Sequence, residues 1–256
     1  MRVLGAVLVA LWLLLASFML VLSPPVTHIL AEKNVDLRGT QLTRDYLVSV
    51  ADDTRAYCAG FVVALPLGSD ERVAFTPEVM AHLDDVRAVF VACEWAALAL
   101  SVGLAVYLAV AWRLYPSAIR TLSEDGVVQK RTGKKQWRSA ANGDQRAPGA
   151  AKNPLTQALV IGALTPLVLA VCLAVVGFLN FEALFSAMHR IFFAEGSWLF
   201  AADSLLIRAL PEGFWIGCAL VWALSLLLLC LIVLAVAFRR GSARHSPKGS
   251  ATARSR

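Results

Sequence analysis

The sequence predicts an all-α membrane protein with four transmembrane helices and an extracytoplasmic cap of short interfacial helices. Of its 256 residues, 58% are apolar, whereas soluble domains are about 45–50% apolar. No strand-like alternation of apolar and polar residues is present, so the crossings are predicted to be helices and not barrel strands. Four apolar runs are each long enough to cross a hydrocarbon core of about 30 Å, which takes about 20 helical residues. They are Leu4–Leu22, Ala88–Trp112, Leu155–Phe178 and Phe214–Phe238.

Charge is distributed unevenly among the segments that join these runs. The net charge is +6, and the excess of Lys and Arg lies in segment 113–152 and in the tail from Arg239 onward. Segments 23–85 and 180–213 carry more acid than base. The positive-inside rule therefore predicts that both termini and the middle loop are cytoplasmic. We expect the basic charge to meet anionic lipid headgroups and not nucleic acid.

This topology divides the chain into four segments. The first run is expected to be an uncleaved anchor, because its apolar core is longer than that of a typical signal peptide. The middle loop has few apolar residues and is predicted to be disordered. The segments are 1–114, with the first two transmembrane helices and outer loop 23–76; 115–153, the cytoplasmic basic loop; 154–238, with the last two transmembrane helices and outer loop 180–213; and 239–256, the cytoplasmic basic tail.

Both outer loops are predicted to contain short helices. Thr40–Val48 has the pattern of an amphipathic helix, with Tyr46 on its apolar side. Asn180–Phe193 places aromatic residues at helical spacing but is too short to span, so we expect it to lie in the membrane interface. The stretch 203–211 predicts a further short helix, capped by Asp203.

The second crossing is predicted to begin before the bilayer. Thr76 suits an N-cap, Pro77 a first helical turn, and Glu78 the positive end of the helix dipole. At about 1.5 Å per residue, a helix from here to the end of the apolar run exceeds the hydrocarbon thickness. His82 and Asp85 lie three residues apart in these extra turns and therefore share a face near headgroup depth.

One carboxylate, Glu94, is predicted to lie about two turns inside the membrane. An ionised carboxylate there costs at least about 2.5 kcal/mol unless it is paired. Arg87 lies seven residues earlier on nearly the same face, so we expect a structural ion pair between the two. A catalytic or gating role for Glu94 is the less favoured alternative.

The four histidines fall into two groups. His28, after a Pro-Pro turn, and His245, in the basic tail, are expected to be solvated. His82 and His189 each lie in an outer-loop helix, and an imidazole can take up or donate a proton at neutral pH. The plain alternative is that both are surface groups that titrate freely. We predict no metal, because zinc-binding His spacings are absent, and no nucleophile, phosphate-loop or dinucleotide motif is present.

Three motifs extend this interpretation. They are F-T-P-E-x-x-x-H-x-x-D-V-R at 75–87, N-F-x-x-L-F-x-x-x-H-R-I-F-F-A-E-G-S-W at 180–198, and D-S-L-L-I-R-x-L-P-x-x-F-W at 203–215. The chain resembles a bacterial four-helix integral membrane family whose characterised members are lipoprotein intramolecular transacylases. The resemblance covers the four crossings and both outer loops; the long middle loop and the basic tail depart from it.

The resemblance implies an intramolecular O-to-N acyltransferase without a cofactor in the bacterial cytoplasmic membrane. Its substrate would be a diacylglyceryl lipoprotein whose sn-2 acyl chain moves to the amine of the N-terminal cysteine. His82 and His189 match the two histidines of the family and would be the acid and base, with Asp85 orienting His82. The residues implied in substrate binding are Phe192, Phe193, Trp198 and Asp203, to which we add Tyr46.

Two other functions stay open at this point. The first is a non-catalytic scaffold or lipid- or partner-binding protein of the same family, with structural or pH-sensing histidines. The second is a membrane metallohydrolase. Replacing each of the two histidines by alanine distinguishes a scaffold from an enzyme. The zinc content of the purified protein tests the metallohydrolase.

Overall fold

The computed structural model describes residues 2–65, 75–114 and 154–242. The predicted disordered loop 115–153 lies outside the described residues, as does the part of the predicted basic tail from residue 243 onward. Every regular element in the described ranges is a helix.

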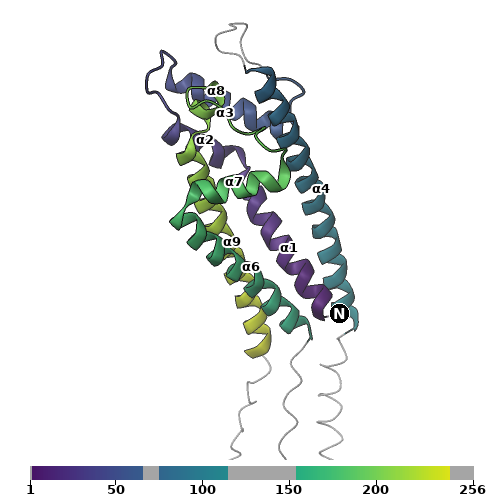
Figure 1. Ribbon diagram of the computed structural model, residues 1–256. Helices are drawn as coiled ribbons and strands as arrows, with labels where there is room; N and C mark the ends of the chain where they lie inside the picture. Colours follow the sequence, from purple (N-terminus) through teal and green to yellow (C-terminus); the bar gives the residue numbers. More distant parts are fainter. Residues whose placement is uncertain (1, 66–74, 115–153, 243–256) are drawn as a thin grey trace, which may run out of the picture.

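Four long helices form the body of the molecule (Figure 1): α1 (Arg2–Val21), α4 (Pro77–Leu114), α6 (Pro154–Leu179) and α9 (Glu212–Ser242). All four are long and apolar enough to cross a membrane. Large apolar side chains such as Trp95 and Phe178 are exposed along them. Exposed apolar surface on this scale is expected where the surrounding medium is lipid, so the predicted all-α membrane fold with four spanning helices is confirmed.

Helix α1 lies at the centre of this body and contacts α4, α6 and α9. It packs closely against α6, where a Cβ added to Gly162 would lie 2.7 Å from the Cβ of Val9. Leu13, on the same side of α1, is fully buried with Leu226 of α9. The ends Arg2, 114, 154 and 242 lie together at one end of the molecule (Figure 1), as an even number of crossings requires.

A helical cap covers the other end. It consists of α2 (Pro24–Asn34), α3 (Arg44–Cys58), α8 (Leu205–Ala209) and their connections. The segment after Pro24-Pro25 was expected to be a turn, and that prediction is wrong: α2 begins at Pro24, because proline fits the first helical turn without a hydrogen bond to lose. Helix α3 begins at Arg44 and not at Thr40, with the Thr43 hydroxyl accepting from the Tyr46 amide at 3.2 Å.

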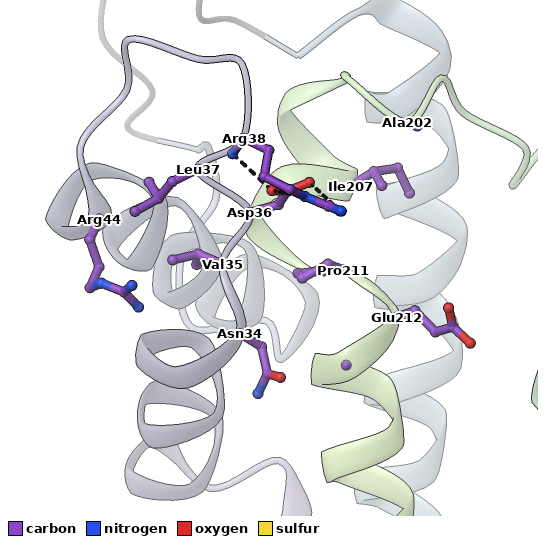
Figure 2. A pocket seen from close by; sticks show the side chains of 11 residues that line it. Asn34, Val35, Asp36, Leu37, Arg38, Arg44, Ala202, Ile207, Pro211 and Glu212 are labelled. Atoms are coloured by element: carbon purple, nitrogen blue, oxygen red, sulfur yellow. Dashed lines mark hydrogen bonds and ion pairs between the residues drawn. The ribbon is translucent and has the colours of Figure 1, made fainter.

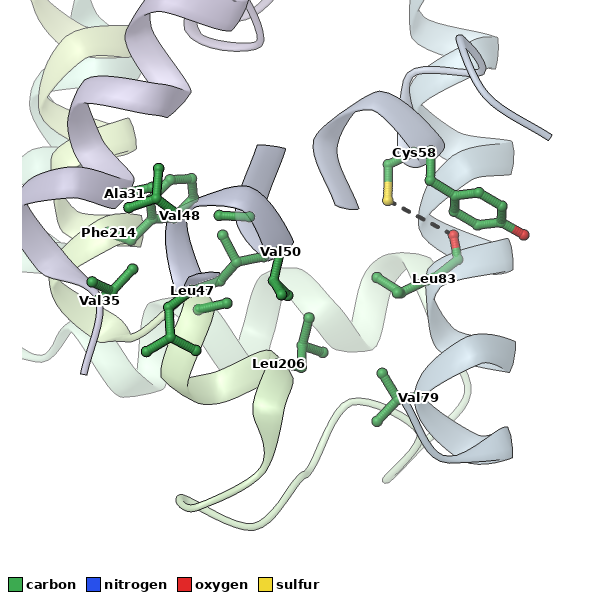
Figure 3. Packing of buried hydrophobic residues seen from close by; sticks show 14 residues of the cluster. Ala31, Val35, Leu47, Val48, Val50, Cys58, Val79, Leu83, Leu206 and Phe214 are labelled. Atoms are coloured by element: carbon green, nitrogen blue, oxygen red, sulfur yellow. Dashed lines mark hydrogen bonds between the residues drawn. The ribbon is translucent and has the colours of Figure 1, made fainter. Parts of the chain in front are cut away.

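The cap has its own apolar core (Figure 3). Leu47 and Val50 of α3 are fully buried in it and pack with residues of α2, α8 and the start of α9. Val79 and Leu83, from the first turns of α4, belong to the same cluster. Because these residues hold the start of α4 against the cap, they fix the position of His82, which lies between them in sequence.

Helix α7 (Phe181–Phe192) runs across the long helices between the end of α6 and α4 (Figure 1). The Asn180 side chain caps it by accepting from the Ala183 amide at 2.9 Å. This matches the predicted helix over 180–193. The following helix, α8, differs from expectation: Ser204 is its N-cap and accepts from the Ile207 amide at 3.4 Å. Asp203 was the predicted cap, and instead its backbone carbonyl accepts from Arg208 Nε at 3.0 Å.

Candidate functional site

The histidines of α4 and α7 meet at the cap end of the molecule. The ring centroids of His82 and His189 lie 6.1 Å apart, with an angle of 28° between the rings. Each residue is only 7% exposed. The two rings are therefore not freely titrating surface groups, although 106 residues separate them in sequence.

Aromatic rings enclose the histidine pair. Phe193 lies against both, with centroid distances of 4.9 Å to His82 and 5.4 Å to His189. Phe185 and Trp198 flank His189 at 4.0 Å and 5.6 Å, and Phe200 flanks His82 at 5.6 Å. This apolar enclosure lowers the local dielectric and strengthens any polar interaction made inside it.

A backbone hydrogen bond fixes the tautomer of His189. Its Nδ1–H donates to the carbonyl of Phe185 at 2.8 Å, and a carbonyl can only accept. In the neutral ring Nε2 therefore carries the lone pair. Burial lowers the pKa of His189 below its usual 6.5, while the bond to the Phe185 carbonyl opposes this shift. His189 thus presents a basic nitrogen at neutral pH.

His82 has an unsatisfied nitrogen. Its Nδ1 is buried and has no hydrogen-bond partner among the described residues. Asp85, predicted to orient this ring, therefore does not accept from Nδ1. The hydroxyl of Ser197 and the indole N–H of Trp198 are likewise buried without a partner in the described part of the chain. Native proteins satisfy nearly all buried polar atoms with hydrogen bonds. Three unsatisfied polar atoms in one region are therefore expected of a site that binds a polar ligand.

A hollow of about 510 Å³ opens beside His82. One wall comes from the first turns of α4, and the other from the loop that follows α7. That loop turns at Gly196, whose φ of +84° favours glycine. The residues that line the hollow are Thr76, Glu78, Ala81, His82, Asp85, Gly196, Ser197, Leu199, Phe200 and Ala201.

The remaining predicted substrate-binding residues are placed in two ways. Phe193 and Trp198 belong to the aromatic enclosure, and Phe192 touches it through a centroid distance of 6.3 Å to Phe193. Asp203 is exposed and does not line the hollow. Tyr46 packs against the core of the cap. The structure therefore brings the aromatic residues to the histidines but not Asp203 or Tyr46.

The expected ion pair between Arg87 and Glu94 is absent from the described residues, so that prediction is wrong. The guanidinium of Arg87 turns toward the cap, where its Nη1 donates to the carbonyl of Val62 at 2.8 Å. It also lies 4.8 Å from the ring centroid of Tyr57. Arg87 therefore contacts Val62 and Tyr57 on the cap side, and not the carboxylate of Glu94 that helical spacing had predicted.

Three residues beside the histidines were not singled out from the sequence: Phe185, Ser197 and Phe200. Phe185 lies four residues before His189, so helical spacing was a usable signal. Ser197 and Phe200 lie near His82 because of the course of the loop that follows α7. No local sequence pattern predicts that course.

A larger hollow of about 740 Å³ lies elsewhere on the cap, between the α2–α3 connection and the start of α9 (Figure 2). Its main polar feature is a two-pronged ion pair in which Arg38 Nε and Nη2 bind Asp36 at 2.9 Å and 3.0 Å. Neither histidine lines it. Within the described ranges no three His, Cys, Asp or Glu residues gather as a metal ion would require.

Four spanning helices, a helical cap and a buried histidine pair between them define a polytopic membrane protein with a candidate acid–base centre. The family model described as lipoprotein intramolecular transacylase Lit matches residues 3–215. The chain belongs to this family of bacterial membrane proteins.

Solved structures share the fold. The lipoprotein intramolecular transacylase Lit from Bacillus cereus, solved in meso, has 15% sequence identity and a TM-score of 0.64, and the match covers 96% of both chains. Structures of the same protein with one histidine replaced by arginine or by alanine match with TM-scores of 0.57 and 0.56. At this identity the likeness shows a shared fold. No curated protein sequence matches the chain.

Proposed function

We propose that this protein moves the sn-2 acyl chain of a diacylglyceryl lipoprotein to the amine of its N-terminal cysteine, with His82 and His189 as the acid and base. The observation that carries the proposal is the convergence of two buried imidazoles, 6.1 Å apart, from separate halves of the chain. Family membership supplies the substrate class. The charge pattern of the loops supports a cap on the outer face, with both termini cytoplasmic.

The reaction balances without an external reagent. The substrate ammonium gives one proton to an imidazole, and the free amine then attacks the carbonyl carbon of the sn-2 ester. As the new C–N bond forms, the nitrogen gives a second proton to the other imidazole, the C–O bond to the glyceryl oxygen breaks, and that oxygen receives a proton from an imidazolium. The remaining proton leaves to water, so the product, an N-acylated lyso-lipoprotein, is an isomer of the free-amine form of the substrate.

The geometry of His189 supports a role in proton transfer. Its Nδ1–H is committed to the Phe185 carbonyl, so Nε2 is the nitrogen that accepts and returns a proton. His82, packed against Phe193 and Phe200, is held in place by its neighbours and not by a carboxylate. Two positioned imidazoles allow one to deprotonate the amine while the other serves the leaving oxygen.

Proximity replaces a covalent nucleophile in this mechanism. Amine and ester belong to one substrate, and holding them in reactive geometry supplies about 7–11 kcal/mol of the barrier reduction. The aromatic enclosure and the exposed apolar side chains of Ile191 and Phe192 offer a surface suited to acyl chains. Membrane lipid and acylated peptide are therefore the partners that this surface accommodates.

A non-catalytic scaffold is a weaker account of the same site. A buried polar atom without a partner costs about 1–3 kcal/mol, and a purely structural role gives no reason to keep the Nδ1 of His82 in that state. In an enzyme the unpaired atom has a reason, because the bound substrate would supply the missing hydrogen bond.

The proposal is tested by mass spectrometry of lipoprotein N-termini in a bacterial host without this activity. Expression of the wild-type chain should convert the diacylglyceryl form to the lyso form. His82→Ala and His189→Ala should each abolish the conversion at equal membrane abundance. His28→Ala is the matched control, because His28 lies on the cap in an exposed ion pair with Asp52 and should leave conversion intact. Absence of the lyso form with the wild-type chain would falsify the proposal.

A further inference from the structure

Helix α3 ends in a tight turn that holds one aromatic side chain away from the protein. The Gly60 amide donates to the Tyr57 carbonyl at 3.0 Å, and the Phe61 amide donates to the Ala56 carbonyl at 2.9 Å. With a φ of +74° at Gly60, this is the bonding of a Schellman motif, in which the residue after the glycine commonly packs back on the helix. Phe61 is instead 74% exposed. Its ring is therefore presented outward by a backbone that hydrogen bonds hold in place.

Contacts with two long helices place this turn at the cap-side boundary of the hydrocarbon layer. Helix α1 has 20 residues, the length needed to cross a core of about 30 Å, and Phe18 lies in its last turn. The Phe18 ring lies 5.8 Å from the ring of Phe90 in α4, so the two rings share a depth. A Cβ added to Gly60 would lie 3.3 Å from Cγ2 of Val91. The turn is therefore level with the region where lipid headgroups meet acyl chains.

Apolar side chains continue from this turn along one face of α4. They lie at the spacing i, i+4, i+7 and i+11 and are Val91, Trp95, Leu98 and Val102. The last three are exposed. The rise from the first to the last is about 16 Å, which is about half the thickness of the hydrocarbon core. This apolar row is as long as one leaflet is deep, and an extended acyl chain can lie along it.

A positive charge without a counter-ion lies beside Phe61. The guanidinium carbon of Arg55 is 6.0 Å from the centroid of the Phe61 ring. Within the described part of the chain Arg55 takes part in no ion pair, and its buried Nε and Nη1 have no hydrogen-bond partner. Asp52, one turn earlier on α3, is paired with His28 instead. Because the Arg55 side chain is partly exposed, an anion from outside the chain can neutralise it.

We propose that this surface binds one anionic phospholipid of the membrane leaflet on the cap side, with its phosphate at Arg55 and an acyl chain along Phe61 and the apolar row of α4. A phospholipid joins the two chemistries that the surface offers, an anion acceptor for a guanidinium and a chain for an apolar track. An anionic headgroup is favoured over a zwitterionic one, whose own ammonium offsets the phosphate charge.

This site is separate from the candidate acid–base centre. Neither Arg55 nor Phe61 lines the hollow beside His82. A diacylglyceryl lipoprotein carries no phosphate on its glyceryl group, so the charge at Arg55 selects a membrane phospholipid and not the proposed substrate. The inference therefore adds a lipid partner to the protein and does not depend on acyl transfer.

The first test counts lipids bound to the full-length chain in detergent by native mass spectrometry. Phosphatidylglycerol and phosphatidylcholine with identical chains are the probes. The wild-type chain should bind the first phosphatidylglycerol about tenfold more tightly than the first phosphatidylcholine, as expected for a charge-assisted hydrogen bond. Equal affinities overturn the proposal. Glycerol 3-phosphate, which has the charge without the chains, should bind at least about tenfold more weakly than phosphatidylglycerol; equal binding would make free phosphate the occupant and overturn the lipid site.

Variants locate the preference for the anionic lipid. Arg55→Gln should remove most of it, whereas Arg55→Lys, which keeps the charge, should retain part of it. Arg38→Gln is the matched control, because Arg38 is also an exposed arginine of the cap but is already paired with Asp36. An unchanged preference in Arg55→Gln, or an equal loss in Arg38→Gln, shows that Arg55 does not form the site.

A second measurement leaves Arg55 unchanged. The full-length chain, with p-benzoylphenylalanine in place of Phe61, is irradiated in phosphatidylglycerol nanodiscs and its mass is determined. A covalent lipid adduct is expected at this position. The same group in place of Leu37, an exposed apolar residue on the connection between α2 and α3, should give none. If no adduct forms at position 61, or if adducts form equally at both positions, the turn after α3 is not a lipid-binding surface.

Discussion

The carbonyl of Phe185 accepts the Nδ1 proton of His189, one turn further along α7, at 2.8 Å. The two rings also lie against each other, with centroids 4.0 Å apart. This pairing sets the tautomer and the rotation of the imidazole from within one helix. The electronic state of His189 is therefore a property of α7 and of the depth at which α7 is buried.

The pH dependence of acyl transfer should reflect this state. Burial lowers the pKa of His189 below 6.5, so the ring is neutral and basic at pH 7. Activity should persist as pH falls to 6.5 and decline only below it. For the same reason the contribution of His189 to stability is present above pH 6.5 and is lost as pH falls through the lowered folded-state pKa. A pH–rate profile of the purified protein measures this, and an acidic limb with its midpoint above 6.5 would contradict it.

The ion pair between α2 and α3 should respond to pH in the opposite direction. His28 Nδ1 lies 2.7 Å from Asp52 Oδ2, and this hydrogen bond and charge raise the pKa of His28 above 6.5. Its stabilisation is fully present below pH 6.5 and is lost as pH rises through the raised pKa. Thermal unfolding of Asp52→Asn should show a smaller difference between pH 6 and pH 8 than the wild-type chain does. An identical difference in both proteins would rule this coupling out.

The contact between α1 and α6 should not tolerate a methyl group at Gly162. An added Cβ would lie 2.7 Å from the Val9 Cβ and 2.8 Å from the Ala6 carbonyl oxygen, so the helices must move apart. We expect Gly162→Ala to lower the free energy of unfolding by about 1–3 kcal/mol. Gly103→Ala is the control: its Cβ would approach nothing closer than 4.0 Å, and alanine is favoured in helices by up to about 1 kcal/mol. Denaturation in detergent compares the two.

Phe193 should affect the rate of the reaction only by holding the two histidine rings in position. Among the described residues its ring is the aromatic ring that touches both histidines, so Phe193→Ala frees two imidazoles at once. A misplacement of about 1 Å can cost about 10²-fold in rate, and we expect a loss of that order in lyso-lipoprotein formation. Phe178→Ala serves as the control because Phe178, in α6, is 91% exposed. Similar rates for both variants would remove Phe193 from the candidate site.

The four crossings could be predicted because length and hydropathy are local properties. Thr76 was likewise correctly chosen as the start of α4, since its hydroxyl lies 3.4 Å from the Val79 amide. Helix α2 was missed because Pro24-Pro25 suits both a turn and a first helical turn, and only docking on the cap decides between them. N-cap propensity also could not decide between the adjacent residues Asp203 and Ser204, because both side chains can accept a hydrogen bond from the first turn of a helix.

Tertiary partners account for the other differences. Helical spacing allowed Arg87 to reach Glu94, but the Val62 carbonyl and the Tyr57 ring lie on a segment whose path the spacing cannot reveal. The sequence motifs pointed to His82 and His189 separately. Their closeness depends on how α7 crosses the bundle, which follows from packing and not from either motif.

Each histidine enters from a different half of the chain, and α1 touches both halves. A nascent chain in which only α1 and α4 have been inserted therefore carries His82 but not His189. The histidine pair of the candidate site is complete only once α6, α7 and α9 have packed against α1 and α4, so the site assembles at the end of membrane insertion.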